Sequence, residues 1–263
     1  MIRLLTEKDQ KSVLDYLYHE PTYNIFLIGD IETYGFNVPF QRIYAEFDDE
    51  GHYRSVFLRY RENAIYYAHE KRFNEEYLSI FNKDPFNYIS GKSELMAFVR
   101  PHLVGFSFKH MYFCEATSCV ETRGDDTEIK TVKTEDDARH LFDLLQVIDE
   151  FNYKDKQPDV FVKEKMESLD MGITLFIEKN HQIVSTVATT AETTKNAMVV
   201  AVATHPNHRE RGYASRLMKR LMTLYIQEKG KSLCLFYNNP DAGKIYHRLG
   251  FKTIGTWDMH QRQ

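Results

Sequence analysis

The sequence has few cysteines, no long hydrophobic run and no large excess of charge of one sign. Its 3 cysteines are an odd number, and Cys114 and Cys119, with four residues between them, lack the second pair of a zinc site. We therefore expect free thiols, no bound metal and no disulfide scaffold. No apolar stretch approaches the roughly 18 residues of a membrane-spanning helix. The 34 basic and 38 acidic residues give a net charge of −4, which provides no general attraction for nucleic acid or a membrane surface.

The beginning of the chain also lacks the pattern of a secretory signal. Residues 1–9 read MIRLLTEKD, with charges where a signal peptide has its apolar core, so we expect a cytoplasmic protein. The chain is 43% hydrophobic and 27% charged, which is typical of a globular protein and excludes a disordered one. Its 263 residues suffice for one large domain or two modest ones.

Two segments about half a chain apart resemble each other. Residues 6–17 (TEKDQKSVLDYL) and 134–145 (TEDDARHLFDLL) are identical at five positions, all at an offset of 128. Each offers a threonine N-cap, acidic residues in the first turn and apolar residues at helical spacing. Each also follows a short strand-like run, at residues 2–5 and 128–132. These features predict a strand and a helix that occur twice.

The similarity continues as three predicted strands after each helix, at residues 43–48, 56–60 and 64–69 and at residues 173–178, 182–191 and 197–204. We therefore predict an α+β fold made of two related units, each a mixed, mostly antiparallel central sheet flanked by helices. The polar stretch 121–126 marks the expected boundary. It divides the chain into domains 1–124 and 125–263.

The two predicted units differ after their third strand. The second has HPNHRERGYAS at residues 205–215, followed by a long helix, whereas the first has HEKRFNEE at residues 69–76, without a glycine. We expect the first unit to keep the fold in an eroded form and the second to be complete.

The segment from residue 197 to residue 230 has the pattern of an anion site. AMVVAVAT (197–204) predicts a buried central strand. It leads into a turn with Gly212 and Ala214 that opens a helix, which we expect to end at Gly230. Small residues admit a ligand close to the backbone, and the first N–H groups of a helix favour phosphate. Residues 205–220 carry five cations and one anion, a local charge of +4. The alternative is an ordinary solvated helix start with basic surface residues.

A second informative segment follows the predicted strand 232–237. Asn239 is suited to cap a helix, and Pro240 is suited to its first position. Ala242, Ile245 and Leu249 form an apolar stripe, and Gly250 is the expected end. Tyr246 lies one position off this stripe, so we expect it to be partly turned from the core.

These two segments resemble the signatures of one family. Val202-x-Thr204-x-Pro206-x-x-Arg209-x-x-Gly212-Tyr213-Ala214 is similar to the acetyl-CoA-binding motif of the GCN5-related N-acetyltransferases (GNATs). Asn239-Pro240-x-Ala242-x-Lys244-Ile245-Tyr246-x-x-Leu249-Gly250-Phe251 looks like the second signature of the same family. The two motifs cover residues 197–256. Weaker similarity extends over residues 128–263 and, in eroded form, over the first half.

The resemblance implies acetyl-CoA as cofactor and assigns roles to individual residues. The strand that matches residues 200–204 binds the pantetheine arm through backbone groups in the family, and the following loop wraps the pyrophosphate. Asn239 matches a residue that contacts the pantetheine or orients the loop near it, and Tyr246 matches a tyrosine near the thioester sulfur that can protonate the leaving thiolate. A phenol, with a pKa of about 10, carries that proton at neutral pH. The cofactor-binding residues implied in this way are Val200, Val202, Ala203, Thr204, Arg209, Glu210, Arg211, Gly212, Tyr213, Ala214, Ser215, Asn239 and Tyr246.

A general base is not evident in the sequence. Family members often have a carboxylate on the strand that matches residues 197–204, but this strand contains none. Glu192, just before the strand, and Glu150 are candidates that would act through water, unless the amine arrives neutral. His205 and His208 lack a third ligand for a metal, and Cys234 is expected to be a packing residue.

We therefore expect an acetyl-CoA-dependent N-acetyltransferase. The acceptor would be a small amine, an amino acid or a peptide N-terminus, attacked directly in a ternary complex, and a homodimer is left open. One alternative is a non-catalytic acyl-CoA-binding regulatory module. Another is a nucleotide-phosphate binder of a different class, but residues 209–214 lack the Lys-Ser/Thr ending of a P-loop and the length of a dinucleotide fingerprint.

Overall fold

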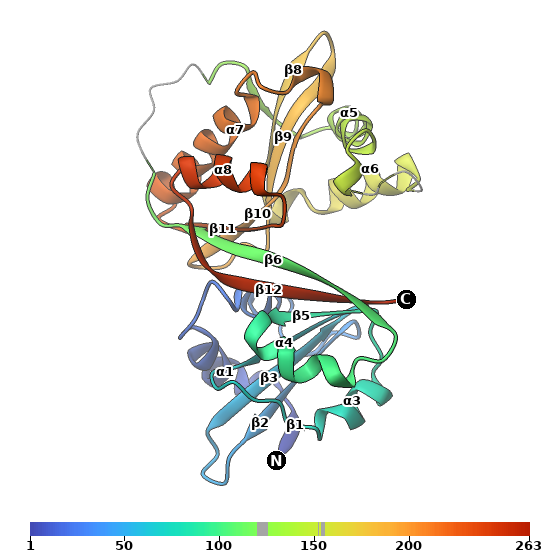
Figure 1. Cartoon of the computed structure of the whole chain (residues 1–263), viewed down its shortest axis with the longest axis vertical. Coiled ribbons are helices and arrows are strands. Elements are labelled where there is room, and N and C mark those ends of the chain that lie inside the picture. The colour runs from blue at the N-terminus through green and yellow to red at the C-terminus, as the bar shows by residue number, and fades with distance from the viewer. Residues whose placement is uncertain (120–125, 152, 154–155) are drawn as a thin grey trace. The chain divides into compact units, whose positions relative to one another are not determined.

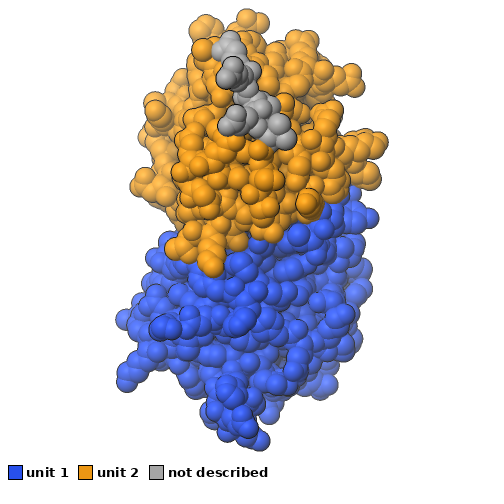
Figure 2. Space-filling model, turned by 90° about the vertical axis from the view of Figure 1, so that its left-hand side faces the viewer, with its two compact units in different colours: residues 1–114, 236–239, 253–263 blue, residues 115–235, 240–252 orange. Residues whose placement is uncertain are grey.

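The structure is a computed structural model that describes residues 1–119, 126–151, 153 and 156–263. The chain forms two compact units, coloured separately in Figure 2. Unit 1 comprises residues 1–114, 236–239 and 253–263, and unit 2 comprises residues 115–235 and 240–252. The expected domain boundary between residues 124 and 125 lies outside the described residues. The units also do not follow chain order, because the last strand belongs to unit 1.

The elements follow the same order in the two halves of the chain (Figure 1). The first half contains β1 (Ile2–Leu4), η1 (Glu7–Asp9), α1 (Gln10–Leu17), α2 (Ile25–Tyr34), β2 (Gln41–Phe47), β3 (Tyr53–Tyr60), β4 (Asn63–Ala68), α3 (Tyr77–Lys83), β5 (Tyr88–Lys92), α4 (Ser93–Val99), η2 (Arg100–His102) and β6 (Phe106–Ala116). The second half contains β7 (Ile129–Thr131), α5 (Glu135–Gln146), η3 (Asp149–Phe151), α6 (Pro158–Glu167), η4 (Leu169–Met171), β8 (Thr174–Lys179), β9 (Gln182–Thr190), β10 (Asn196–Thr204), η5 (Pro206–His208), α7 (Tyr213–Met222), η6 (Thr223–Glu228), β11 (Ser232–Tyr237), α8 (Pro240–Arg248) and β12 (Lys252–Arg262). The short η elements aside, both read strand, two helices, three strands, helix, strand, helix, strand. The three predicted strands after each first helix are confirmed.

Unit 2 is built on a sheet with the order β11-β10-β9-β8-β7. Its strands pair antiparallel except β10 and β11, which are parallel. Helices α5 and α6 cover one face of this sheet, and α7 and α8 cover the other (Figure 1). Leu141, Phe142 and Phe161 from α5 and α6 are buried together with Phe176 of β8. The mixed α+β fold with a central sheet between helices is therefore confirmed.

Unit 1 has the sheet order β1-β2-β3-β4-β5-β12-β6. Its first four strands are antiparallel, and β4 and β5 are parallel. The core is rich in aromatic rings, and Phe57, Tyr66, Tyr67 and Tyr77 are almost fully buried. None of the helices among the described residues of either unit is long and apolar enough to cross a membrane.

Strand β12 explains why unit 1 departs from the expected domain 1–124, and why unit 2 departs from the expected domain 125–263. Its residues 257–261 pair antiparallel with residues 88–92 of β5. Trp257 is 3% exposed and belongs to the hydrophobic core of unit 1. Backbone pairing and burial of the chain's one tryptophan thus place the C-terminal strand with the N-terminal unit.

Threonine caps begin the first helical segment of each half, as predicted. Thr134 Oγ1 accepts from the amide of Asp137 at 3.1 Å, and the Asp137 carboxylate accepts from the amide of Thr134 at 3.0 Å. In the first half the Asp9 carboxylate accepts from the amide of Thr6 at 2.8 Å. Arg3 adds two hydrogen bonds to the same carboxylate, at 2.9 and 2.6 Å. These hydrogen bonds, that from Arg3 above all, lower the pKa of Asp9 to about 2.

We predict that Asp9→Ala lowers the free energy of unfolding by about 1 kcal/mol at pH 7, as loss of a helix cap does. Because the pKa of Asp9 in the folded state is below its ordinary value, this stabilisation is complete above about pH 4 and disappears as the pH falls to about 2. Urea unfolding of both proteins between pH 7 and pH 2 measures the difference. Asp15→Ala is the control, since Asp15 is exposed and its ion pair is with the exposed Lys11. A difference that is the same at pH 2 as at pH 7 would contradict the role of the carboxylate.

Candidate functional site

Strand β10 changes its pairing partway along. Its residues 196–198 are in parallel register with residues 232–234 of β11, and the strand then continues to Thr204 while paired to β9. The register with β9 shifts between Val200 and Ala203, and Ala201 has a left-handed φ of 51°. Such a bulge turns the backbone of one strand out of the regular ladder. Ala197 and Met198 are buried, whereas Val200 is 36% exposed. The predicted pantetheine-binding residues Val200, Val202, Ala203 and Thr204 therefore lie on the irregular half of the strand.

The loop after β10 is folded back on the end of the strand. The amide of His205 donates to the carbonyl of Val184 at 2.9 Å, and Thr204 Oγ1 lies 2.9 Å from Ser185 Oγ. Arg209 Nε donates to the carbonyl of Thr204 at 3.3 Å, and Arg211 donates to the carbonyl of Asn207 at 3.4 Å. The two guanidinium groups thus stay beside the loop.

Gly212 stands at the N-cap of α7, at the place where the sequence predicts the anion site. It has φ 77° and ψ 5°, and Glu210 also has a positive φ of 63°. A Cβ at Gly212 would have nothing within 4 Å, so glycine is needed here for its conformation rather than for space. The first helical hydrogen bond runs from the amide of Arg216 to the carbonyl of Gly212 at 3.0 Å. Gly212 has no side chain that could accept hydrogen bonds from the amides of Tyr213, Ala214 and Ser215. These three amides are therefore the natural donors to an anion.

The electrostatics of the loop differ from the simple count of +4. Arg216 donates to Glu128 at 2.9 Å, and Arg220 donates to Glu228 at 2.9 Å, so carboxylates outside the counted segment neutralise two of its five cations. Another cation arrives from α8, where Arg248 donates to Ser215 Oγ at 3.4 Å. Arg248 was not identified from the sequence, since only the packing of α8 beside α7 brings it to the first turn. Arg209, Arg211 and Arg248 are therefore the cations that the fold gathers near the turn.

Tyr246 is buried in unit 2, contrary to our expectation that it turns partly from the core. Its side chain is 8% exposed, and its ring packs edge-on against Phe251 with the centroids 6.1 Å apart. The buried residues of α8 are Gly243 and Tyr246, followed by buried Leu249 just after the helix, and Ala242 and Ile245 are only half-buried. The helix is rotated from the expected stripe because the large ring gains more from burial than the smaller side chains do.

Asn239 and Pro240 lie where the sequence placed the start of α8. The helix begins at Pro240, directly after Asn239. Asn239 is the last residue of a segment that groups with unit 1, and Pro240 opens the part of α8 in unit 2.

Of the two candidate bases, Glu192 lies at the opposite end of β10 from the Gly212 turn. Glu192 comes before β10 in the chain, and the Gly212 turn comes after this strand. The nine residues of β10 make eight steps of about 3.3 Å, so the two ends of the strand are roughly 26 Å apart. The Glu192 carboxylate accepts from Lys231, Lys229 and the Tyr225 hydroxyl at 2.7, 2.9 and 2.8 Å. Burial alone would raise the pKa of Glu192, but these hydrogen bonds lower it below its ordinary value. Glu150 is exposed in η3. The contacts of Glu192 are those of a structural carboxylate.

The other residues considered from the sequence have structural surroundings. Cys234 is buried, its thiol faces the carbonyl of Ala197 at 3.7 Å, and burial raises its pKa. The rings of His205 and His208 lie edge to face, 5.7 Å apart. In the ranges that the structure describes, no group of three or more His, Cys, Asp or Glu side chains could hold a metal ion.

Unit 1 repeats the parallel strand pair, but it has neither the register shift of β10 nor a glycine turn after the strand. Residues 63–65 of β4 pair in parallel with residues 88–90 of β5, a register of the same length as that of β10 with β11. The segment 69–76 that follows contains no glycine, and Glu75 and Glu76 directly precede α3. Negative charge at a helix start opposes phosphate binding.

The comparisons with known proteins agree with this geometry. Residues 128–254 match the family model described as acetyltransferase (GNAT) domain. A GCN5-related N-acetyltransferase-like protein from Streptococcus suis shares 14% identity over 98% of this chain and 100% of its own, with a TM-score of 0.60. A tandem GNAT protein from the clavulanic acid biosynthesis pathway shares 12% identity over 99% and 97%, with a TM-score of 0.58.

A third similar structure, of a Drosophila protein, has 11% identity over 100% of this chain and 98% of its own, with a TM-score of 0.68. At these identities the likeness concerns the fold. No curated protein sequence matches the chain. Taken with the Gly212 turn and the bulged strand before it, the family match shows that the chain carries a GNAT acetyltransferase domain over residues 128–254.

Proposed function

We propose that the chain is an N-acetyltransferase that uses acetyl-CoA and acetylates a primary amine by direct attack in a ternary complex. The acceptor class is a small amine, an amino acid or a peptide N-terminus. The observation that carries this proposal is the turn at Gly212, where a left-handed glycine caps α7 directly after the bulged strand β10. A GNAT fold supports acyl transfer in general, and this turn adds a seat for the diphosphate of the cofactor.

The residues present fit coenzyme A. The amides of Tyr213, Ala214 and Ser215 would hold the pyrophosphate, with Arg209, Arg211 and Arg248 supplying charge nearby. The backbone of residues 199–204 extends past the register with β11 and would pair with the pantetheine amides. When bound, the cofactor supplies an activated acetyl thioester.

We assign to Tyr246 the role of proton donor to the leaving thiolate. Its phenol would hold a proton on Oη and donate it to the leaving thiolate. Burial of the side chain and the contact with Phe251 restrict the ring to one position. This positioning is what a general acid needs, because proton transfer requires a short and reproducible distance.

The first half of the chain is, in our proposal, a diverged copy of the same unit. The identical order of elements and the matching parallel register of β4 and β5 support common descent. The absence of glycine from residues 69–76 and the presence of Glu75 and Glu76 support loss of the phosphate turn.

A non-catalytic acyl-CoA-binding module is the second candidate. It is favoured by the lack of a carboxylate on residues 197–204 and by the ion pairs of Glu192 with two lysines. Thiol release from acetyl-CoA, measured over a panel of amines, separates the two functions. The enzyme releases coenzyme A with at least one amine of the panel, whereas the binding module is stabilised by acetyl-CoA in a thermal shift and releases none.

We predict that Gly212→Leu weakens acetyl-CoA binding at least 10-fold in calorimetry, because a side chain at the turn blocks close approach of the pyrophosphate. Gly105→Leu is a matched control. Gly105 has a φ of 76°, against 77° for Gly212, and neither position has an atom within 4 Å of a new Cβ. Both variants should lose similar stability, and only Gly212→Leu should lose the cofactor. Equal affinity of the two variants for acetyl-CoA would refute the assignment of the turn.

We predict that Tyr246→Phe lowers kcat about 100-fold and leaves the Kd for acetyl-CoA unchanged, since the ring still fills its place and only the proton donor is lost. Glu192→Gln serves as the comparison. It should keep kcat within about 3-fold, and it should lower Tm because two lysines lose their carboxylate. Stopped-flow thiol release and thermal unfolding measure both. A Tyr246→Phe variant as fast as the wild type would remove the acid role, and a large loss of kcat in Glu192→Gln would restore Glu192 as a base.

A further inference from the structure

Strand β12 carries a histidine whose ring is removed from water. His260 is 1% exposed, and neither of its ring nitrogens has a hydrogen-bond partner in the part of the chain that the structure describes. All 11 histidines lie among the described residues, and each of the others is half-buried or exposed. Removing a polar ring from water without hydrogen bonds is costly, and the cost is greater when the ring is charged.

The strands beside β12 face His260 with uncharged side chains. Because side chains alternate along a strand, His260 and Asp258 share one face of β12, whereas Trp257 lies on the other. Phe108 of β6 stacks on the imidazole, with the ring centroids 5.4 Å apart and the planes at 22°. On the other side, His260 is in register with Ile89 of β5, which is fully buried. Such an environment favours the neutral imidazole over its charged form.

Two charged groups act on the His260 ring, the Asp258 carboxylate on the same strand and the Arg100 guanidinium on η2. Asp258 is 2% exposed, and its carboxylate accepts from Ser93 Oγ at 2.7 Å and lies 2.6 Å from His110 Nδ1. Arg100 lies 3.9 Å from the same carboxylate. Burial lowers the pKa of His260 below its ordinary value, and Arg100 adds to this effect, although Asp258 acts in the opposite direction. The carboxylate has partners of its own, so a proton on His260 would add a poorly compensated charge to the interior.

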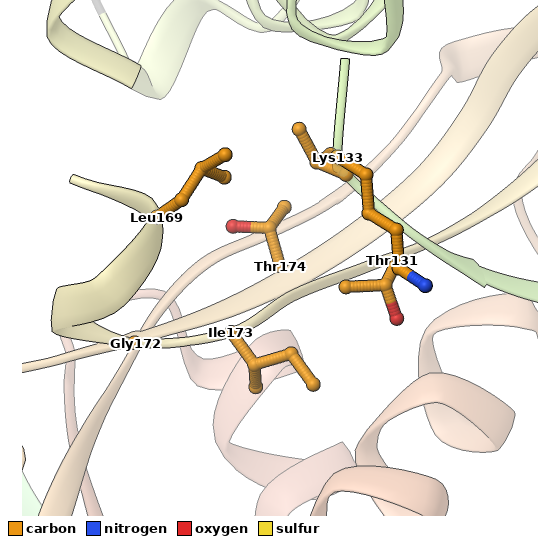
Figure 3. A pocket seen from close by; sticks show the side chains of 7 residues that line it. Thr131, Lys133, Leu169, Gly172, Ile173 and Thr174 are labelled. Atoms are coloured by element: carbon orange, nitrogen blue, oxygen red, sulfur yellow. The ribbon is translucent and has the colours of Figure 1, made fainter. Parts of the chain in front are cut away.

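The cost of burying His260 depends on pH, and this distinguishes it from another buried group without a partner. The hydroxyl of Thr174 in unit 2 is such a group, and Figure 3 shows this residue beside a pocket of about 350 Å³. A hydroxyl carries no charge at ordinary pH, so the cost of its burial is the same in neutral and acid solution. An imidazole in water takes up a proton near pH 6.5. Burial of His260 therefore becomes less favourable as the pH falls.

We propose that His260 makes the pairing of the C-terminal strand sensitive to acid, so that protonation of its ring loosens β12 from unit 1. When β12 leaves its place, the ring reaches water and can take up a proton, whereas within the sheet it stays neutral. The open form is therefore favoured as the pH falls below about 6.5, the ordinary pKa of histidine. His110 does not oppose this, because it is half-exposed and can be charged beside Asp258 without leaving water. The proposal is independent of the cofactor turn and is tested without acetyl-CoA.

Hydrogen exchange of the full-length protein tests the proposal, read at residues 257–261 of β12 and at their partners 88–92 of β5. Between about pH 7.5 and pH 5.5, protection corrected for the intrinsic exchange rate should fall at least about 3-fold more in the wild type than in His260→Phe. Phenylalanine keeps a ring stacked on Phe108 and takes up no proton. His52→Phe is the matched control, because His52 is an exposed histidine of the same unit. This variant should keep the fall seen in the wild type.

NMR titration of the His260 ring in the wild-type protein makes the test independent of how the variant folds. In the folded protein the ring should take up its proton at a lower pH than in an isolated peptide of residues 253–263, because only the peptide leaves the ring in water. Protonation at the same pH in protein and peptide would overturn the proposal. An equal loss of protection in the wild type and His260→Phe would overturn it too, as would a loss that His52→Phe abolishes.

Discussion

The backbone hydrogen bonds of β10 are the constraint on which the site depends. Every buried N–H and C=O group of a strand needs a partner. On one side of β10, strand β9 supplies hydrogen-bond partners. On the other side, the pairing with β11 stops at Met198. The bulge at residues 200–203 and the left-handed Ala201 then leave the remaining groups on the β11 side without a regular ladder. Val200 in this stretch is 36% exposed, so water can satisfy such groups, and in the proposed function the amide groups of the cofactor's pantetheine arm would take its place.

Local signals in the sequence located most elements of the fold. The threonine caps at Thr6 and Thr134, the three strands of each half, the turn at Gly212 and the end of the following helical segment at Gly230 were all predictable. Gly230 has a φ of 67°, and the amide of the next residue, Lys231, donates to the carbonyl of Tyr225. These features are set by neighbours within a few residues, where propensity and capping decide.

Long-range packing decided what the sequence did not reveal. The place of β12 depends on pairing between residues that are 165 positions apart, such as Lys92 and Trp257. Arg248 reaches Ser215 only because α8 lies beside α7. Arg216 forms an ion pair with Glu128, which lies 88 residues earlier in the chain. Tyr246 turned inward because burial of a ring outweighs an idealised helical stripe. No local window contains these partners, so periodicity alone cannot predict them.

The position of β12 has a consequence for synthesis of the chain. A ribosome makes proteins from the N-terminus, so residues 1–114 emerge well before the strand that joins their sheet between β5 and β6. Until residues 253–263 emerge, the edges of β5 and β6 that β12 will occupy are unpaired, and exposed strand edges are prone to association with other chains. The first half of the nascent chain therefore keeps an incomplete sheet with unpaired edges until residues 253–263 have left the ribosome.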